Sequence, residues 1–224
     1  MKHFVVTLGR SCGSGGVEVG RTLAKKLGVE YYDSKLLRLA SDDSGISEEL
    51  FARADEKLKK TLLFKVSRKS YGGEVIPPES ADFTSSENLY NYQAKVIKDL
   101  AAQESCIIIG RCADYVLKDN PDVISVFCYS DVEERIQWSI DEYQVPAKQA
   151  KKIVQEKDTQ RARFYEFYTN QKWGNARNYT LMINTSKMST DEAVQLLASF
   201  YDVKKGIPTF KNAFENQYEK NNTY

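Results

Sequence analysis

The sequence predicts an α/β protein with a doubly wound, parallel sheet of five strands. Short apolar runs rich in β-branched residues alternate with longer stretches whose apolar residues have helical spacing. A glycine-rich turn joins the first apolar run to the first helical stretch, and no internal repeat or low-complexity tract interrupts the alternation. Such alternation is typical of a parallel sheet with helices on both faces.

Composition narrows the class of protein. The chain has 224 residues, 42% of them hydrophobic, and a net charge of +1, so we expect one large domain and neither a nucleic-acid nor a membrane partner. No apolar run approaches the roughly 18 residues of a membrane span, and Met1 leads directly into a strand. The four cysteines are scattered, which favours a cytoplasmic location. The single histidine, His3, argues against a zinc site or a histidine-based triad.

The first strand, loop and helix carry the clearest chemical signal. Residues 4–8 form an apolar run, and residues 17–27 have Val19, Leu23 and Leu27 at helical spacing. Glycines between them let backbone amides converge on an anion, and the helix N-terminus adds partial positive charge. The expected anion-binding residues are Gly9, Ser11, Gly13, Ser14, Gly15 and Gly16.

This loop departs from the standard phosphate-binding pattern G-x-x-x-x-G-K-[ST]. Gly16 stands where the lysine is expected, and Val17 stands where the metal-binding hydroxyl is expected. The sequence therefore predicts an anion-binding loop that lacks the usual lysine. The alternative is a tight turn whose glycines serve packing only.

The next segment combines a short strand with a charged helix. Residues 29–32 predict a strand, and Asp33 is either a helix N-cap or an acceptor for a substrate hydroxyl or amine. Lys35 and Arg38 lie on the polar side of the helix that follows. Residues 46–64 predict another helix, and residues 67–86 have the composition of a loop.

The second half of the chain repeats the strand-helix alternation. A helix is expected over 87–103, followed by an apolar strand over 106–109. Arg111 comes directly after this strand, so we expect it at the sheet edge where anionic ligands bind. The alternative role for Arg111 is an ion pair under the loop. A short helix is expected near residues 113–117, a fourth strand over 121–128 with Asp131 capping the next helix, and a fifth strand over 179–183. A final helix is expected over 190–201.

One long helix is expected from Pro146 to Tyr168, broken at residues 173–175. It carries Asp158, Arg161 and Arg163, and the two arginines diverge on a straight helix because they are two residues apart. The alternative interpretation is a charged helix face beside an aromatic core stripe.

These motifs together resemble the cytidylate kinase-like branch of the P-loop nucleoside monophosphate kinases, over residues 2–201. The matching stretches are Gly13–Gly16, Tyr32-Asp33, Ile109-Gly110-Arg111, Asp158-x-x-Arg161 with its aromatics, and Trp173 through Asn178-Tyr179 to Asn184-Thr185-Ser186. The resemblance implies a P-loop NTPase fold of the nucleoside monophosphate kinase type over residues 1–204. It also implies a helical acceptor-binding insertion near 34–86 and a lid near 144–178. The polar tail 205–224 is either a docking arm for a homodimer or a loosely packed end.

The resemblance also implies roles for single residues. Asp33 resembles the acid that holds the acceptor, Arg111 the arginine that contacts it, and Arg161 the lid arginine that reaches the transferring phosphate. The motif around Arg111 is incomplete, since Ile109 and Cys112 flank it. The loop lysine is characteristically absent in this branch.

The leading hypothesis is transfer of the γ-phosphoryl of ATP to a nucleoside monophosphate, CMP or dCMP first, with Mg²⁺. Arg10 is the candidate for the missing cation. Without a hydroxyl at position 17, Mg²⁺ relies on ATP oxygens, water and Ser14 or Asp33, and no metal site built by the protein is expected. One alternative is a non-catalytic nucleotide-binding or sensing protein, and another is a kinase of a different small acceptor. The expected catalytic residues are Arg10, Asp158, Arg161 and Arg163, and the expected acceptor-binding residues are Asp33, Lys35, Arg38 and Arg111.

Overall fold

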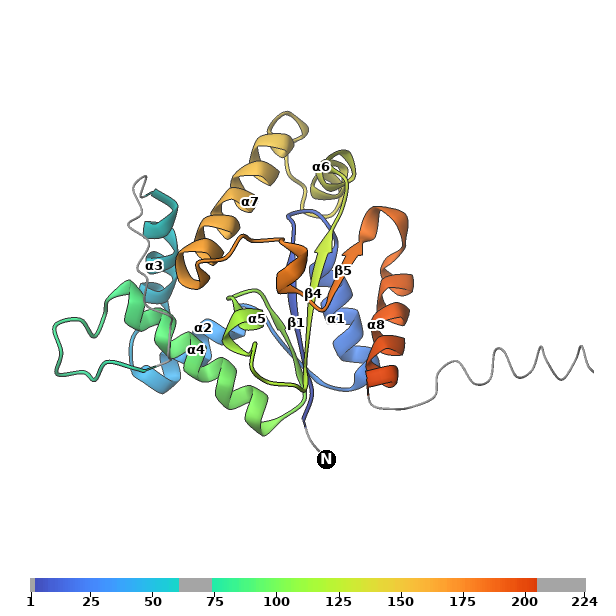
Figure 1. Ribbon diagram of the computed structural model, residues 1–224. Helices are drawn as coiled ribbons and strands as arrows, with labels where there is room; N and C mark the ends of the chain where they lie inside the picture. The colour runs from blue at the N-terminus through green and yellow to red at the C-terminus, as the bar shows by residue number, and fades with distance from the viewer. Residues whose placement is uncertain (1–2, 61–73, 205–224) are drawn as a thin grey trace, which may run out of the picture.

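The computed structural model describes residues 3–60 and 74–204, and its centre is a five-stranded parallel sheet in the order β2-β3-β1-β4-β5. Helices cover both faces of the sheet (Figure 1). The predicted fold class is therefore confirmed.

The strands are β1 (Val5–Arg10), β2 (Glu30–Tyr32), β3 (Cys106–Ile109), β4 (Val123–Tyr129) and β5 (Leu181–Asn184). The helices are α1 (Gly16–Leu27), α2 (Lys35–Ser44), α3 (Glu48–Lys60), α4 (Ser86–Gln103), α5 (Ala113–Val116), α6 (Val132–Asp141), α7 (Ala147–Thr169) and α8 (Thr190–Lys204), with 3₁₀ turns η1 (Ala176–Asn178) and η2 (Thr185–Lys187).

Strand β1 is central because it pairs in parallel with both β3 and β4. Alternate residues of a strand point to opposite faces, and this splits the core into two layers. Val6 and Leu8 pack with α1 and α8, whereas Val5 packs with α2, α4 and α5. The chain leaves the carboxyl end of β1 into the glycine loop, at the edge where ligands bind in open parallel sheets.

The ends of β1 and α7 and the cap of α6 can be compared with the sequence-based expectation. β1 continues to Arg10, because its backbone pairs in register with Cys128 of β4. α7 ends at Thr169, one residue beyond the expected Tyr168, because Asn170 adopts the left-handed conformation (φ 55°) and caps it. Asp131 occupies the N-cap position of α6, but its side chain accepts no capping hydrogen bond; it lies 3.6 Å from Lys187 Nζ instead.

The segment before α4 is anchored by a buried amide. Asn88 Nδ2 donates to the carbonyls of Ile76 and Phe83, and Asn88 Oδ1 accepts from Ile76 N at 2.7 Å. The end of the helix predicted to reach residue 64, the loop residues up to 73 and the tail 205–224 lie outside the described residues. Among the helices that are described, none combines the length and apolar character needed to cross a bilayer.

Candidate functional site

The glycine loop is built so that only glycine fits at its centre. Gly13 has φ +75°, and a Cβ atom there would lie 2.2 Å from the carbonyl oxygen of Arg135 on α6. Gly15 also has positive φ (+68°) and precedes the first residue of α1. These conformations turn the chain sharply from β1 into α1, which places the loop amides at a helix N-terminus.

Neighbouring strands hold the loop in place. Ser11 N donates to the Cys128 carbonyl at 3.0 Å, and Ser14 Oγ donates to the Ser11 carbonyl at 2.9 Å. The hydroxyl oxygen of Thr185 lies 2.8 Å from the Ser14 carbonyl and 2.9 Å from the Tyr129 carbonyl. The loop is therefore fixed to the carboxyl ends of β4 and β5, and the Ser14 hydroxyl is already engaged within the loop.

Position 16, where the standard lysine is expected, has no room for a side chain. A Cβ atom on Gly16 would lie 2.7 Å from Cβ of Arg10 and 3.0 Å from Cβ of Cys128. The lysine is thus excluded by packing between α1 and the end of β1.

Two adjoining cavities open at the carboxyl edge of the sheet. The smaller, of about 120 Å³, is enclosed by residues 10–17 with Tyr143 of the α6–α7 connection. The larger, of about 500 Å³, lies beside it. Arg10, Lys157 and Arg161 line both cavities, so three cationic side chains mark the boundary between them. The larger cavity is lined further by Gly9, Asp33, Ser34, Ile109, Gly110, Arg111, Cys112, Asp114, Gln160, Phe164, Tyr165, Trp173 and Tyr179.

Arg10 is a partly buried cation at this boundary. Burial, and then the positive charge of Arg161, lower the pKa of Arg10 to about 10, so it stays charged at neutral pH. Its guanidinium lies against Gly110, where a Cβ atom would approach Nη1 to 2.7 Å. Among the described residues, its buried Nε has no hydrogen-bond partner. A buried, unsatisfied donor on a cationic side chain favours an anionic ligand.

Asp158 connects α7 to the loop and to two arginines. Its Oδ1 accepts a hydrogen bond of 2.7 Å from Cys12 N, and its Oδ2 accepts from Nη1 of Arg135. Arg161 Nη1 lies 3.6 Å from Asp158 Oδ1 and 3.4 Å from the Arg10 carbonyl. One carboxylate thus holds Arg161 at the mouth of the loop.

The larger cavity combines cations with aromatic rings. The Arg111 guanidinium lies 5.8 Å from the centre of the Phe164 ring, and Arg111 Nη1 lies 3.5 Å from Gln93 Oε1. Asp33 also lines this cavity, and its Oδ1 accepts from the Ser34 hydroxyl at 3.1 Å. Charge suited to a phosphate and rings suited to a flat group therefore occupy one space.

Asp114 and Tyr165 form a polar pair in the wall of the larger cavity. Tyr165 Oη donates to Asp114 Oδ2 at 2.6 Å. Burial raises the pKa of Asp114 to about 6, despite this hydrogen bond. Burial and then the Asp114 carboxylate raise the pKa of Tyr165, so its hydroxyl stays protonated and donates.

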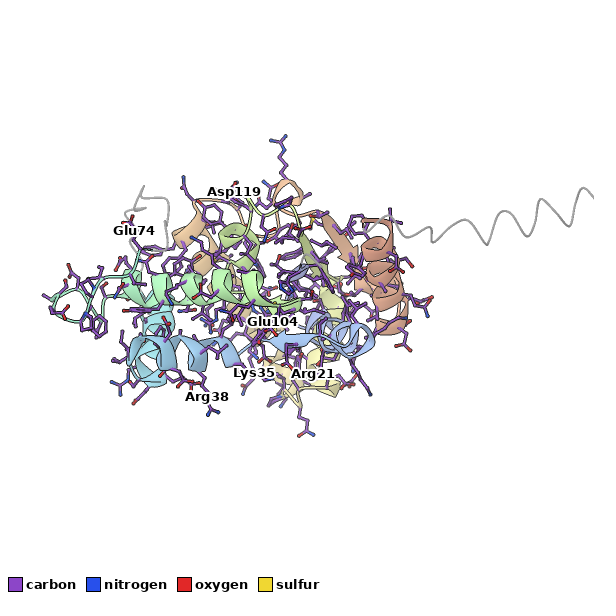
Figure 2. All side chains as sticks on the ribbon, turned by 90° about the horizontal axis from the view of Figure 1, so that it is seen from below. Arg21, Lys35, Arg38, Glu74, Glu104 and Asp119 are labelled. Atoms are coloured by element: carbon purple, nitrogen blue, oxygen red, sulfur yellow. The ribbon has the colours of Figure 1, made fainter. Side chains whose placement is uncertain are left out.

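Some of the residues expected at the site line neither cavity. Lys35 is exposed and lies 3.7 Å from Glu30 Oε2, and Arg38 is exposed on the same helix. Both extend from α2 to the outside of the molecule (Figure 2). Arg163 is also absent from both linings, because two residues along α7 turn it away from Arg161.

Three residues at the site were not singled out from the sequence. Lys157 stands four residues before Arg161, a spacing that could have placed it on the same helix face. Arg135 and Asp114 carry no such local signal, because their partners Asp158 and Tyr165 are distant in sequence.

The described residues do not provide a cage for a metal ion. No group of three or more His, Cys, Asp or Glu side chains suited to a metal occurs within residues 3–60 and 74–204. Val17 has no hydroxyl, and that of Ser14 is engaged. The residues present therefore do not fit a resident Mg²⁺ site.

The strand order and the glycine loop before α1 define the P-loop kinase class of fold. The chain belongs to the cytidylate kinase-like family, whose model matches residues 5–187.

Solved structures resemble the chain over most of its length, among them an uncharacterized protein and a shikimate kinase. An uncharacterized protein from Eubacterium ventriosum ATCC 27560 is 25% identical, with a TM-score of 0.65, and the match covers 89% of this chain and 99% of that one. Shikimate kinase from Bacteroides thetaiotaomicron is 14% identical, with a TM-score of 0.52 and coverage of 89% and 98%. The second likeness concerns the fold. No protein with a curated description matches the chain.

Proposed function

We propose that this protein transfers the γ-phosphoryl group of ATP to a nucleoside monophosphate, with CMP or dCMP favoured. The observation that carries the proposal is the pair of adjoining cavities with Arg10 and Arg161 at their boundary. Family membership supports the same reaction class.

In this proposal the loop cavity binds the donor phosphates. The glycine amides of the loop and the N-terminus of α1 border this cavity and would attract an anion, and the helix dipole adds to the attraction. Mg²⁺ enters with ATP, bound to phosphate oxygens and water, because the chain has no fitting cage of its own among the described residues.

The larger cavity would bind the acceptor. Arg111 is suited to a bidentate contact with the acceptor phosphate, and Asp33 to a hydroxyl or amine of the same molecule. Phe164, Tyr165 and Trp173 line the same cavity with aromatic side chains, which would suit a flat base. Helix α7, with Asp158 and Arg161, serves as the lid, and the α2–α3 region belongs to the acceptor side.

Little covalent chemistry is asked of the protein in this reaction. It aligns the acceptor phosphate with the terminal phosphate of the donor and neutralises charge on the transferring group. Arg10 and Arg161 are positioned for the second task, since both line the boundary between the cavities.

The test is ADP release from MgATP with CMP, dCMP, UMP and AMP as acceptors, together with calorimetric binding of ATP and CMP. We expect turnover with a pyrimidine monophosphate and its loss in Arg161→Ala. Release of ADP only with a different phosphorylated or hydroxylated acceptor would redirect the proposal to another small-molecule kinase.

A second candidate is a non-catalytic nucleotide-binding protein. It is favoured by one observation: Gly16 leaves no space for the lysine that P-loop enzymes use. Nucleotide binding without transfer to any acceptor in the panel would support it.

A further inference from the structure

The loop proposed to bind the donor phosphates has no lysine at position 16, where the standard P-loop carries one. Gly16 cannot be replaced by lysine without a Cβ contact of 2.7 Å to Arg10. Phosphoryl transfer nevertheless needs positive charge placed at the transferring group. If this chain is a phosphotransferase, that charge has to come from another element.

Three cations border both cavities, and they differ in their surroundings. Arg10 is partly buried, and its guanidinium lies against Gly110, which lines the larger cavity. Arg161 lies near the carboxylate of Asp158 and the carbonyl of Arg10. The third, Lys157, makes no hydrogen bond or ion pair within the described ranges 3–60 and 74–204, and it is exposed at the cavity mouth.

The position of Lys157 on α7 suits a contact with a terminal phosphate. Lys157 and Arg161 are four residues apart, so they share one face of the helix, and both line the loop cavity. The hydrogen bond from Cys12 N to Asp158, the next residue after Lys157, fixes this turn of α7 to the loop. A lysine is a compact charge with three donors on a flexible stem, and it can follow a phosphoryl group as it moves.

We infer that Lys157 contacts the terminal phosphate of the donor nucleotide and replaces the absent loop lysine as a catalytic residue. The inference rests on the proposed function for the identity of the donor. During transfer, an oxygen of the acceptor phosphate forms a bond to the γ-phosphorus. The bond from that phosphorus to the β,γ-bridging oxygen breaks, and ADP leaves with the electron pair. Lys157 keeps its proton throughout and stabilises charge.

The experiment compares Lys157→Ala and Lys157→Arg with wild type, using calorimetric binding of the Mg²⁺ complexes of AMP-PNP and ADP. Lys151→Ala is the matched control, since Lys151 is exposed on the same helix and lines neither cavity. We expect Lys157→Ala to weaken AMP-PNP binding at least tenfold and ADP binding less than twofold. Turnover with the best acceptor should fall at least 100-fold, and Lys157→Arg should restore part of both.

The outcomes separate this inference from the proposed function. Transfer by the wild type with unchanged AMP-PNP binding and turnover in Lys157→Ala would overturn the role of Lys157 and leave the function intact. Equal weakening of AMP-PNP and ADP would also overturn it, because the γ-phosphate would not be the group contacted. Selective loss of AMP-PNP affinity without any wild-type transfer would support the contact and refute the kinase activity.

Discussion

Cys12 and Asp158 are 146 residues apart in the sequence, yet Cys12 N donates a 2.7 Å hydrogen bond to Asp158 Oδ1. The bond joins the phosphate-binding loop to α7, the helix that carries Lys157 and Arg161. Asp158 also accepts from Arg135, whose side chain is 13% exposed. The carboxylate therefore neutralises a largely buried arginine while it positions α7 over the loop.

Replacing Asp158 with alanine should destabilise the protein and weaken transfer together. The change removes hydrogen bonds to Arg135 and Cys12, and each hydrogen bond involving a charged group contributes about 1.5–3 kcal/mol. We expect the free energy of unfolding, measured in urea, to fall by about 2–4 kcal/mol. The double variant Asp158→Ala/Arg135→Met should recover part of this loss, because Arg135 would no longer be a largely buried, unpaired charge. A double variant less stable than Asp158→Ala would contradict this account.

Gly13 and Gly28 form a matched pair for testing the shape of the loop. Both have positive φ (+75° and +66°), so alanine at either position costs about 1–2 kcal/mol in backbone strain. A Cβ atom at Gly13 would also lie 2.2 Å from the Arg135 carbonyl, whereas nothing lies within 4 Å of one at Gly28. Gly13→Ala should therefore lower the unfolding free energy by about 2 kcal/mol more than Gly28→Ala. Equal urea midpoints for the two variants would show that α6 does not press on the loop.

Restoring the standard lysine should harm this protein. In Gly16→Lys the new Cβ would approach Arg10 Cβ to 2.7 Å and Cys128 Cβ to 3.0 Å. Overpacking of this kind costs about 1–3 kcal/mol, and the displaced Arg10 is one of the cations at the cavity boundary. We expect a lower melting temperature and lower affinity for MgATP, measured by calorimetry. A Gly16→Lys variant with normal stability and tighter MgATP binding would refute the packing argument.

Local sequence patterns were enough to predict the fold. The apolar run of residues 106–109 and the glycines before α1 are patterns in consecutive residues, and the structure has a strand, β3, and a helix, α1, where these patterns predict them. Gly28 ends α1 as its C-cap, as a glycine after the last helical residue predicts, since its N–H reaches the carbonyls of Ala24 and Lys25. Strand ends shifted by one or two residues because pairing with neighbours, which the sequence does not display, decides them.

The site was less predictable because its residues converge from distant segments. Arg10, Asp33, Arg111 and Arg161 were expected near a ligand, and all four line the larger cavity. Their contribution to activity stays a prediction. Lys35 and Arg38 have the charge expected of acceptor-binding residues, but helix rotation directs them outward. Residue type alone does not reveal which face of a helix is directed toward a cavity.

Asp114 should give the protein a stability that falls as the pH rises. Burial raises the pKa of Asp114 from 3.8 to about 6, so between these values the folded state holds a proton that the unfolded state has lost. Folding is then favoured below pH 4, and this contribution is lost as the pH rises through 6. A shift of about two pKa units corresponds to about 3 kcal/mol at most.

The measurement compares unfolding free energies of wild type and Asp114→Asn from pH 4 to 7. The asparagine variant cannot titrate, and its amide oxygen can still accept the hydrogen bond from Tyr165. We expect wild type to lose stability relative to Asp114→Asn across this range. A constant difference between the two proteins would mean that the Asp114 pKa is not raised in the folded state.

Arg111 should determine affinity for the acceptor rather than for the donor. Its guanidinium lines the larger cavity only, whereas Arg10 and Arg161 line both. If Arg111 binds the acceptor phosphate, Arg111→Ala removes a contact worth about 1.5–3 kcal/mol, and KM for CMP rises about 10- to 100-fold. KM for ATP should change less than threefold, because the loop cavity is untouched.

Arg111→Lys should recover only part of the affinity, since a lysine cannot make the bidentate contact. Arg177→Ala is the control, because Arg177 is exposed and lines neither cavity. Equal increases in KM for both substrates would place Arg111 in a general structural role, beneath the Phe164 ring that it contacts.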